Sequence, residues 1–344
     1  QAEGQTVNID GLTVNTTGRG IKIDDQYVDN PETVDLTVKN ATFSTAKKAA
    51  IMVKSAAGAD ITLSNVNINN VAADKVNAVW VDEDAKQHYG LVTVTGGNLV
   101  LEGTTKLIEG VLKSEDEKEY YIVNAAGLNW LTSEVNTNNN NFKGKTVNLL
   151  VDIDLAGAAQ TRIGQYNATS FEGTFDGMSH TVSNFTITAS DAEKNGNYAT
   201  AFFGRATTAT VIKGLTLDKA TIEGHHWTAA LVGYNHGKVE NCHVTNSVIN
   251  CSHVSDDACG DKAGAIAGIC ADSAGKLIGC SATDCTVKGV RDVGQLVGAA
   301  ATSCVDSACK ATNVKVGVHK SFVDCTDGSA GMNISSNSLI GRIL

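Results

Sequence analysis

The chain has 344 residues and a formal net charge of −10, which disfavours a partner with a phosphate backbone, so we do not expect nucleic acid as a partner. Hydrophobic residues make up 42 % but aromatic residues only 5 %, with one proline beside 34 glycines, a mixture that favours many short strands joined by tight turns. The sequence has no apolar stretch that approaches the roughly 20 residues needed to cross a bilayer, so it predicts no membrane span. The first ten residues are typical of a strand, not a secretory leader, so we expect a mature product or an excised piece.

The first hundred residues repeat pairs of apolar residues at positions i and i+2, three pairs to a copy. Such alternation predicts strands whose paired residues point inward. The pairs are Val7/Ile9, Leu12/Val14 and Ile21/Ile23, then Leu36/Val38, Ala41/Phe43 and Ile51/Val53, then Ile61/Leu63, Val66/Ile68 and Val79/Val81, with a weaker fourth copy from Val92/Val94. Three short strands per turn predict a triangular coil, the parallel β-helix. A propeller or a sandwich is the alternative, but a propeller blade needs four antiparallel strands and about 40 residues.

The charged stretch KSEDEKE (113–119) predicts a boundary between an N-terminal β-helical segment, 1–112, and a second domain, 113–344. Within 125–135, Leu128, Leu131 and Val135 stand at i, i+3 and i+7 and predict a short amphipathic helix. An Asn-rich turn and one strand, TVNLLVDIDL, should follow. A helix over the open end of a coil would cover unpaired backbone groups, so we interpret 119–190 as a cap module.

The C-terminal half repeats an apolar triplet that ends in glycine, and these glycines (204, 233, 268 and 298) are 29, 35 and 30 residues apart. Copies of this length cannot each form a core, but stacked at about 4.8 Å they bury a common one. Five inward columns follow from the alignment. They are Ile212/Val239/Leu277/Asp306, Leu215/Cys242/Cys280/Cys309, Leu217/Val244/Ala282/Ala311, Ala220/Ser247/Cys285/Val314 and Ile222/Ile249/Val287/Val316. The ending SLIGRIL is similar to a further triplet.

These copies, AFFG, ALVG, AIAG and QLVG, each followed by an element similar to Asn241-Cys242, resemble the GLUG-motif repeats of bacterial surface proteins and of metallo-type immunoglobulin A1 proteases. The leading glycine of that motif is replaced here. The resemblance covers about 120–316, while 1–112 matches only a general β-helix pattern. It implies a right-handed, pectate-lyase-like coil on an exported or cell-surface protein of the adhesin type. The sequence therefore predicts an all-β, right-handed parallel β-helix of two segments with one short capping α-helix.

All nine cysteines follow residue 241, and four of them occupy the inward columns. We interpret these four as small buried apolar residues, with neighbouring turns close enough for a disulfide. Cys251 and Cys259, which flank one loop, are the favoured disulfide pair. Zinc is not expected, because the spacings do not form paired C-x₂-C knuckles, and no cofactor is expected.

Catalytic motifs are missing from the sequence, so we expect a protein that is not an enzyme and assign no catalytic residue. No histidine is followed by glutamate, which excludes H-E-x-x-H, and Gly-x-Ser-x-Gly is absent. A polysaccharide lyase or glycoside hydrolase of the same fold stays open as an alternative. The adjacent Asp pairs at 24–25 and 256–257, and Arg291 beside Asp292, are the candidates that it offers.

The turns that follow the last inward strand, EGHHWTA, CSHVSDDACGDKAG and KGVRDVGQ, should stack on one edge of the coil. A tryptophan flanked by polar and acidic groups suits stacking on a sugar ring. The sequence therefore predicts a binding patch for a glycan or a host protein, against the simpler interpretation of a solvated edge. Its residues are His225, His226, Trp227, His253, Asp256, Asp257, Asp261, Arg291 and Asp292. A structural stalk of a larger surface protein is the third hypothesis.

Overall fold

The structure is a computed structural model that describes residues 6–15, 20–24, 34–45, 51–54, 59–68, 79–82, 99–102, 111–113, 118–190, 199–252, 261–271, 274–319, 333–334 and 337–344. These residues form β-strands, one α-helix and a 3₁₀ turn, Thr302–Cys304. The chain divides into two compact units, Gln1–Leu128 and Asn129–Leu344. Among the described residues, no helix has the length and apolar character needed to cross a membrane.

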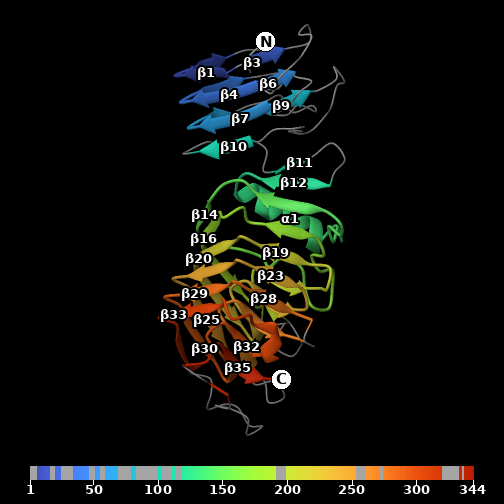
Figure 1. Cartoon of the computed structure of the whole chain (residues 1–344), viewed down its shortest axis with the longest axis vertical. Coiled ribbons are helices and arrows are strands. Elements are labelled where there is room, and N and C mark those ends of the chain that lie inside the picture. The colour runs from blue at the N-terminus through green and yellow to red at the C-terminus, as the bar shows by residue number, and fades with distance from the viewer. Residues whose placement is uncertain are drawn as a thin grey trace. The chain divides into compact units, whose positions relative to one another are not determined.

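The first unit consists of three parallel sheets that the chain visits in turn (Figure 1, blue). The first sheet contains β1 (Thr6–Asp10), β4 (Val34–Lys39), β7 (Ala59–Ser64) and β10 (Leu99–Glu102). The second contains β2 (Thr13–Asn15), β5 (Thr42–Thr45) and β8 (Asn67–Ile68), and the third contains β3 (Ile21–Asp24), β6 (Ile51–Lys54) and β9 (Val79–Asp82). An antiparallel pair, β11 (Val111–Lys113) and β12 (Glu119–Ile122), follows. Three strands per coil is the predicted arrangement.

The register of the first unit places the predicted inward residues in columns. Val7 is opposite Leu36, which is opposite Ile61, and Leu36 and Ile61 are buried. The next residue of this column is Leu99, so the expected start of the fourth copy at Val92/Val94 is wrong. The long connection between β9 and β10 moves the fourth copy of the repeat to a later position in the sequence. A search at a fixed repeat length cannot detect such a shift. Lys22, Met52 and Trp80 are in register, as the alternation predicts, although their side chains are outside the description.

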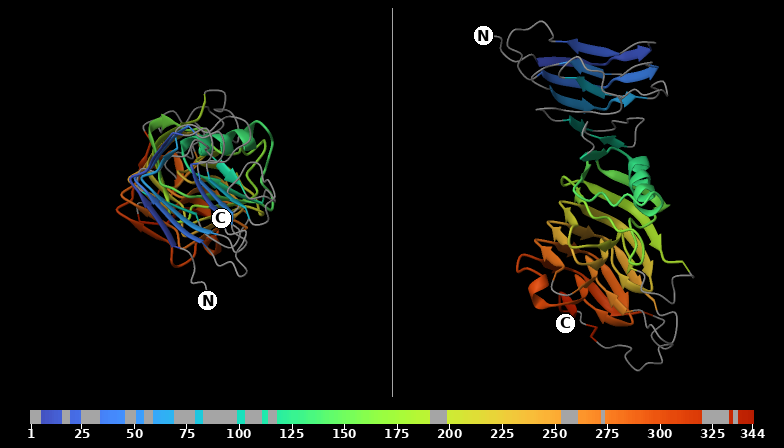
Figure 2. Two further views of the ribbon diagram at one scale, coloured as in Figure 1. Left: turned by 90° about the horizontal axis from the view of Figure 1, so that it is seen from above. Right: turned by 90° about the vertical axis from the view of Figure 1, so that its right-hand side faces the viewer.

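The second unit is built from four sheets of stacked, parallel strands (Figures 1 and 2). Its first sheet contains β13 (Thr146–Leu149), β15 (Thr174–Asp176), β19 (Val211–Lys213), β23 (Lys238–Glu240) and β28 (Lys276–Ile278). The second contains β14 (Ile153–Ala159), β16 (Thr181–Thr188), β20 (Thr216–Gly224), β24 (His243–Thr245), β25 (Val248–Cys251), β29 (Ser281–Thr283), β30 (Thr286–Gly289), β33 (Lys310–Thr312) and β34 (Lys315–Val318). The third contains β17 (Ala199–Thr200), β21 (His226–Thr228), β26 (Asp261–Ala263) and β31 (Arg291–Val293). The fourth contains β18 (Phe203–Ala206), β22 (Val232–Asn235), β27 (Ala267–Cys270), β32 (Val297–Ala300) and β35 (Ile340–Ile343). This parallel, coil-on-coil order is consistent with the predicted β-helix.

The predicted helix is confirmed as α1 (Ala125–Asn136), with Leu128, Leu131 and Val135 fully buried. Its C-terminal part packs against the first coil of the second unit: the Trp130 ring lies edge-on to Phe142 at 5.7 Å. The expectation of one strand for TVNLLVDIDL is wrong, because the chain turns after β13 and enters the second sheet as β14.

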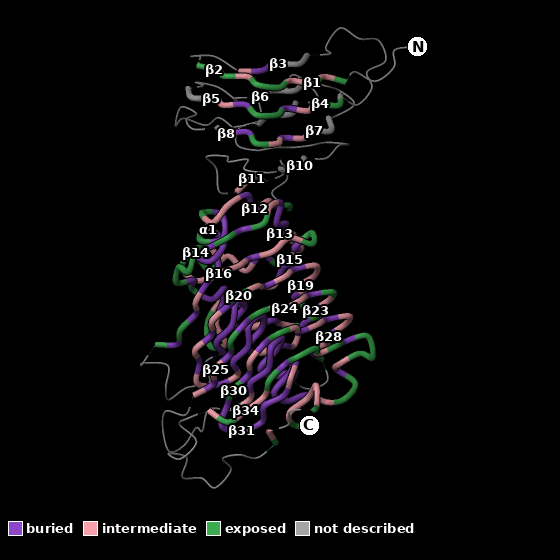
Figure 3. Tube along the Cα trace, turned by 90° about the vertical axis from the view of Figure 1, so that its left-hand side faces the viewer, coloured by how far each residue is buried: buried purple, intermediate pink, exposed green. Residues whose placement is uncertain are grey.

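The column of Leu215, Cys242, Cys280 and Cys309 is present, because the residues that follow these four are paired in register across β20, β24, β29 and β33. All four side chains are buried, and along β20 and β24 buried residues alternate with less buried ones (Figure 3). One inward assignment is wrong: Val305, not Asp306, is opposite Leu277. Asp306 is exposed, and its Oδ1 accepts a hydrogen bond from the Ala308 N–H at 2.8 Å, so this residue forms the turn.

The triplet glycines form a column along the fourth sheet, extended at both ends beyond the four copies expected. The column comprises Gly164, Gly204, Gly233, Gly268, Gly298 and Gly341, so SLIGRIL is a further copy. Glycine is needed because the third sheet comes close: a Cβ on Gly268 would lie 2.6 Å from Trp227 Cα and 2.7 Å from the carbonyl oxygen of Gly233. A side chain there requires the backbone to move.

Gly268→Ala should therefore destabilise the second unit by about 1–3 kcal/mol, the usual cost of overpacking. Gly317→Ala is the matched control, because a Cβ on Gly317 meets nothing within 4 Å, and alanine there should be neutral or slightly stabilising. Denaturant unfolding of the two variants measures the difference. Equal midpoints would mean that the close approach is not a constraint.

Cys280→Asp should prevent folding of the second unit, whereas Cys280→Ala should fold, because the position is fully buried in the column and a carboxylate there has no room for solvent. Circular dichroism and size-exclusion chromatography of both variants give the answer. Similar behaviour of the two would contradict the placement of Cys280 in the core.

Candidate functional site

Parts of the three predicted turns pair as neighbouring strands of the third sheet, while 253–260 of the second turn lie outside the described residues. His226 is followed in this sheet by Asp261 and Arg291, since Thr228 is opposite Ala263, and Asp261 is opposite Arg291. The middle residues of these strands, Trp227, Lys262 and Asp292, have φ of +31°, +62° and +52°. Trp227 is an extra residue relative to the coil before it, because the register shifts between Ala199/His226 and Thr200/Thr228. Such bulges re-aim a side chain, and a bulky residue at positive φ marks a special position.

The described side chains of the predicted patch differ in burial. His226 is buried and Asp292 fully so, while Trp227 is half-buried. Asp292 Oδ1 accepts a hydrogen bond from Asn333 Nδ2 at 2.6 Å, and its Oδ2 lies 3.5 Å from Arg342 Nη1. Asp292 is therefore engaged in contacts within the chain.

The other predicted residues contribute less. His225 is half-buried, with Nδ1 3.0 Å from Ser252 Oγ, and Arg291 is half-buried. The backbone of Asp261 is described but not its side chain. His253, Asp256 and Asp257 lie outside the described residues, as do the predicted partner Cys259 and the pair 256–257 considered for catalysis.

Trp227 instead belongs to an aromatic cluster on the outer face of the fourth sheet. Its ring lies 4.7 Å from that of Tyr166 and 4.6 Å from that of Tyr234, and the two tyrosine rings are 4.6 Å apart. All three residues are half-buried, so part of each remains exposed. We call Tyr166, Arg205, Trp227, Tyr234 and His236 the aromatic cluster.

The two remaining members of the cluster add nitrogen groups to the rings. The Arg205 guanidinium lies over the Tyr166 ring at 5.1 Å, and the imidazole of His236 stacks on Tyr234 at 4.9 Å. Beneath the rings, Trp227 and Tyr234 pack against the buried residues Ile269, Ala271 and Ala299. A rigid base with apolar ring faces and N–H donors at its margin suits a small polar ligand that has one apolar face.

The sequence contains a signal for this cluster that the alignment of inward residues did not use. The residue after each triplet glycine points outward on the fourth sheet, and these residues are Arg205, Tyr234, Ile269, Ala299 and Arg342. Tyr166 is outside this column: the residue after Gly164, the glycine that precedes the recognised copies, is Gln165, and Tyr166 comes one position later. Reading this outward column would have placed Arg205 and Tyr234 beside each other.

A second feature is a polar hollow of about 370 Å³ at the corner between the first and second sheets, lined by Asp176, Lys213 and His243 among others. Lys213 Nζ lies 2.8 Å from Asp176 Oδ2, and His243 Nδ1 lies 2.7 Å from Ser281 Oγ. The hydrogen bond and the charge of Asp176 raise the pKa of Lys213, which keeps the ammonium protonated. A lysine in that state is a poor general base.

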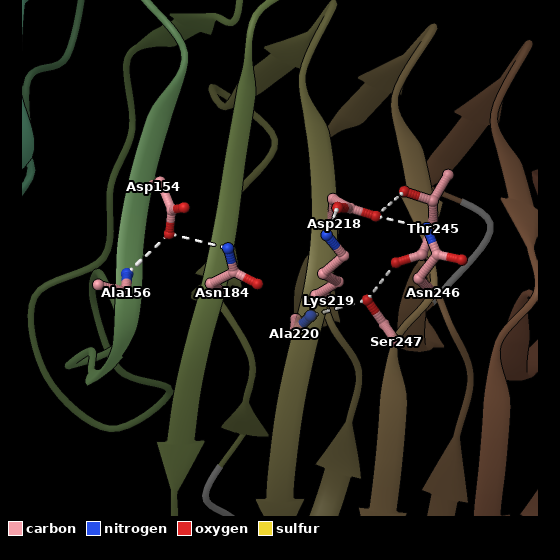
Figure 4. Close-up of polar contacts among 9 residues, drawn as sticks. All are labelled: Asp154, Ala156, Asn184, Asp218, Lys219, Ala220, Thr245, Asn246 and Ser247. Atoms are coloured by element: carbon pink, nitrogen blue, oxygen red, sulfur yellow. Dashed lines mark hydrogen bonds and ion pairs between the residues drawn. The ribbon is translucent and has the colours of Figure 1, made fainter.

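A third group of polar side chains follows one corner of the second sheet (Figure 4). Asp154 accepts from Asn184 Nδ2 at 2.8 Å, and Asp218 accepts from Thr245 Oγ1 and Asn246 Nδ2, both at 2.7 Å. Asn184 and Asn246 have φ near +50°, the left-handed conformation that asparagine tolerates. These contacts join successive coils, so we assign the corner a structural role.

The thiols of Cys242 and Cys270 are not poised for chemistry. Burial raises the pKa of Cys242 and of Cys270 to about 12, so both stay protonated. Cys280 and Cys309 share a hydrogen bond that raises the pKa of Cys280 and lowers that of Cys309. Within the described residues, no group of three or more His, Cys, Asp or Glu side chains is arranged to hold a metal ion.

Comparisons with known proteins give limited matches. No family model matches the chain, so the likeness to GLUG repeats stays a resemblance. An alignment over 143 residues, which covers 38 % of this chain, is 28 % identical to halomucin of Haloquadratum walsbyi, and the match spans 2 % of that protein. A crystal structure of a putative immunoglobulin A1 protease from Bacteroides ovatus is 19 % identical, with a TM-score of 0.34 over 60 % of this chain and 69 % of that one.

The polar corner predicts how stability depends on pH. Burial alone would raise the pKa of Asp218, but the hydrogen bonds from Asn246 and Thr245 together with the nearby Lys219 ammonium outweigh it, and the pKa lies below the ordinary value of 3.8. A carboxyl with a lowered folded pKa stabilises above its unfolded pKa, and that stability is lost as the pH falls through the folded pKa. Asp218→Asn should thus be less stable than wild type at pH 7, with the gap closing below about pH 4.

Denaturant midpoints between pH 7 and 2.5 measure this gap, and Thr245→Val, which removes one donor, should show part of the same effect. A gap that stays constant over this range would contradict the assignment to Asp218.

Proposed function

We propose that this chain is a right-handed parallel β-helix of an exported or cell-surface protein, and that it binds saccharide through the aromatic cluster without catalysing a reaction. The resemblance to GLUG surface proteins supports the exported location, and the local match to halomucin accords with it. The stacked parallel sheets of both units support the coil.

The observation that carries the proposal is the set of three half-buried aromatic rings, each within 4.7 Å of the other two, held on a rigid sheet. A pyranose ring has one apolar face of C–H groups and a rim of hydroxyls. Aromatic rings pack against such a face, while the Tyr and Trp polar atoms and neighbouring N–H groups can bond the rim. A protein loop would also fit such a surface, and the experiment below includes it as an outcome.

The absence of catalysis is supported by the state of the candidate groups. Lys213 is paired with Asp176, and the thiols of Cys242 and Cys270 stay protonated, so none of these groups is a ready base or nucleophile. The polar hollow is the feature that favours the alternative, a polysaccharide-active enzyme, since it brings Asp176, Lys213 and His243 together. Incubation with a panel of polysaccharides, followed by assays for new reducing ends and unsaturated uronates, tests that alternative directly.

Trp227→Ala should weaken binding to an array of glycans and matrix proteins at least about tenfold, because it removes the ring shared by both tyrosines. Trp227→Phe should retain most of the binding. Met178→Ala is the matched control: Met178 is 49 % exposed and lines the polar hollow, so its loss should leave binding unchanged.

Thermal unfolding confirms that each variant is folded before binding is compared. Binding that survives Trp227→Ala but not Met178→Ala would move the site to the hollow. Binding to matrix proteins alone would replace saccharide by a protein ligand, and no binding at all would favour a structural stalk.

A further inference from the structure

We propose that the aromatic cluster selects saccharides that carry a carboxylate, and that Arg205 is the residue that recognises the acid. This inference rests on the proposed function and adds the chemical class of the ligand.

Arg205 carries a positive charge that the described part of the chain leaves uncompensated. Its Nη1 donates to the carbonyl oxygen of Tyr166 at 3.1 Å, and its Nε is buried without a hydrogen-bond partner. Arg205 takes part in none of the ion pairs between described residues. A guanidinium has five N–H donors. A buried N–H without an acceptor raises the free energy of the folded state, so binding of a ligand that supplies an acceptor would be strongly favoured.

The same column provides a comparison within the molecule. Arg342 occupies the equivalent outward position on β35, where it lies 3.5 Å from the buried carboxylate of Asp292. Arg205, at the other end of the column, lies over the Tyr166 ring instead, and no carboxylate of the described residues pairs with it. A carboxylate supplied by a ligand would fill this place.

The surroundings of Arg205 restrict what that ligand can be. The guanidinium is held over the Tyr166 ring at 5.1 Å, and this ring contacts Trp227 and Tyr234. The acid must accordingly belong to a molecule with an apolar face of about the size of an aromatic ring. A pyranose with a carboxylate on its edge meets both conditions, and a planar carboxylate accepts two parallel N–H bonds from arginine.

The test uses the full chain and two probes that differ in charge: galacturonic acid oligomers, and the same oligomers reduced at C6 to neutral galactose oligomers. Isothermal titration calorimetry should give the acidic oligomer an affinity at least about tenfold higher. The preference should shrink as the salt concentration rises to about 0.5 M. Arg205→Gln should abolish the preference while leaving the affinity for the neutral oligomer within about twofold.

Lys238→Gln removes the same charge from the first sheet, at a side chain that is 49 % exposed and paired with Glu240, and should keep the full preference. Equal affinity of the wild type for both probes, or a preference that survives Arg205→Gln, overturns the inference. A sulfated oligomer that binds more tightly than the carboxylated one overturns it too. The proposed function is judged separately: it fails if the wild type binds no saccharide, or if Trp227→Ala leaves binding to every probe and to the array unchanged.

Discussion

The close approach of the third sheet to the glycines of the fourth is the constraint on which both the fold and the site depend. A Cβ at Gly268 would meet the backbone of Trp227, and one at Gly298 would lie 2.6 Å from the Lys262 carbonyl carbon and the Gly268 oxygen. Trp227 thus presses on a glycine of the next coil, and Lys262 does the same one coil later. Because the bulge also turns Trp227 out of the core, the contact that sets the spacing of the coils also sets the position of the central ring.

Inside the coils, cysteine is a small buried residue whose thiol can donate a hydrogen bond. Cys242 Sγ lies 3.3 Å from the carbonyl oxygen of Glu240, two residues earlier, and Cys285 Sγ lies 3.2 Å from that of Thr283. Ser247, next to Cys285 in its column, makes the same contact with the Thr245 oxygen at 2.7 Å. The Glu240 and Thr283 carbonyl oxygens also accept the N–H groups of Gly214 and Asn246, so the thiol adds a second contact to a carbonyl that already has a backbone partner. A small residue that can make this contact fits the corner without forming a metal site or a bridge.

Alternation of apolar residues was enough to predict the coils, the helix and most columns, because period two depends only on local geometry. It failed where a turn changes length: Val305 replaces Asp306, and the fourth coil of the first unit begins at Leu99. The aromatic cluster was harder to predict from the sequence for the same reason. Trp227 could be singled out as an unusual residue in a turn, but Tyr166 is 61 positions away in the sequence, and its contact with Trp227 depends on a coil that lacks the full triplet. Which residues contact each other between coils depends on the register of the strands. That register can be derived only when the number of residues in every turn is known.

Equivalent backbone positions in a stacked protein can carry opposite chemistry, and the third sheet illustrates this. At one position of this sheet, Asp292 is fully buried and lies 3.5 Å from Arg342 of the next coil; at the equivalent position two coils earlier, Trp227 is half-buried and packs against Tyr166 and Tyr234. Both residues have a positive φ. The residue at this position can therefore be an acid that pairs with an arginine or a ring that joins the aromatic cluster, and a repeat of this kind could gain or lose a binding site without altering its core.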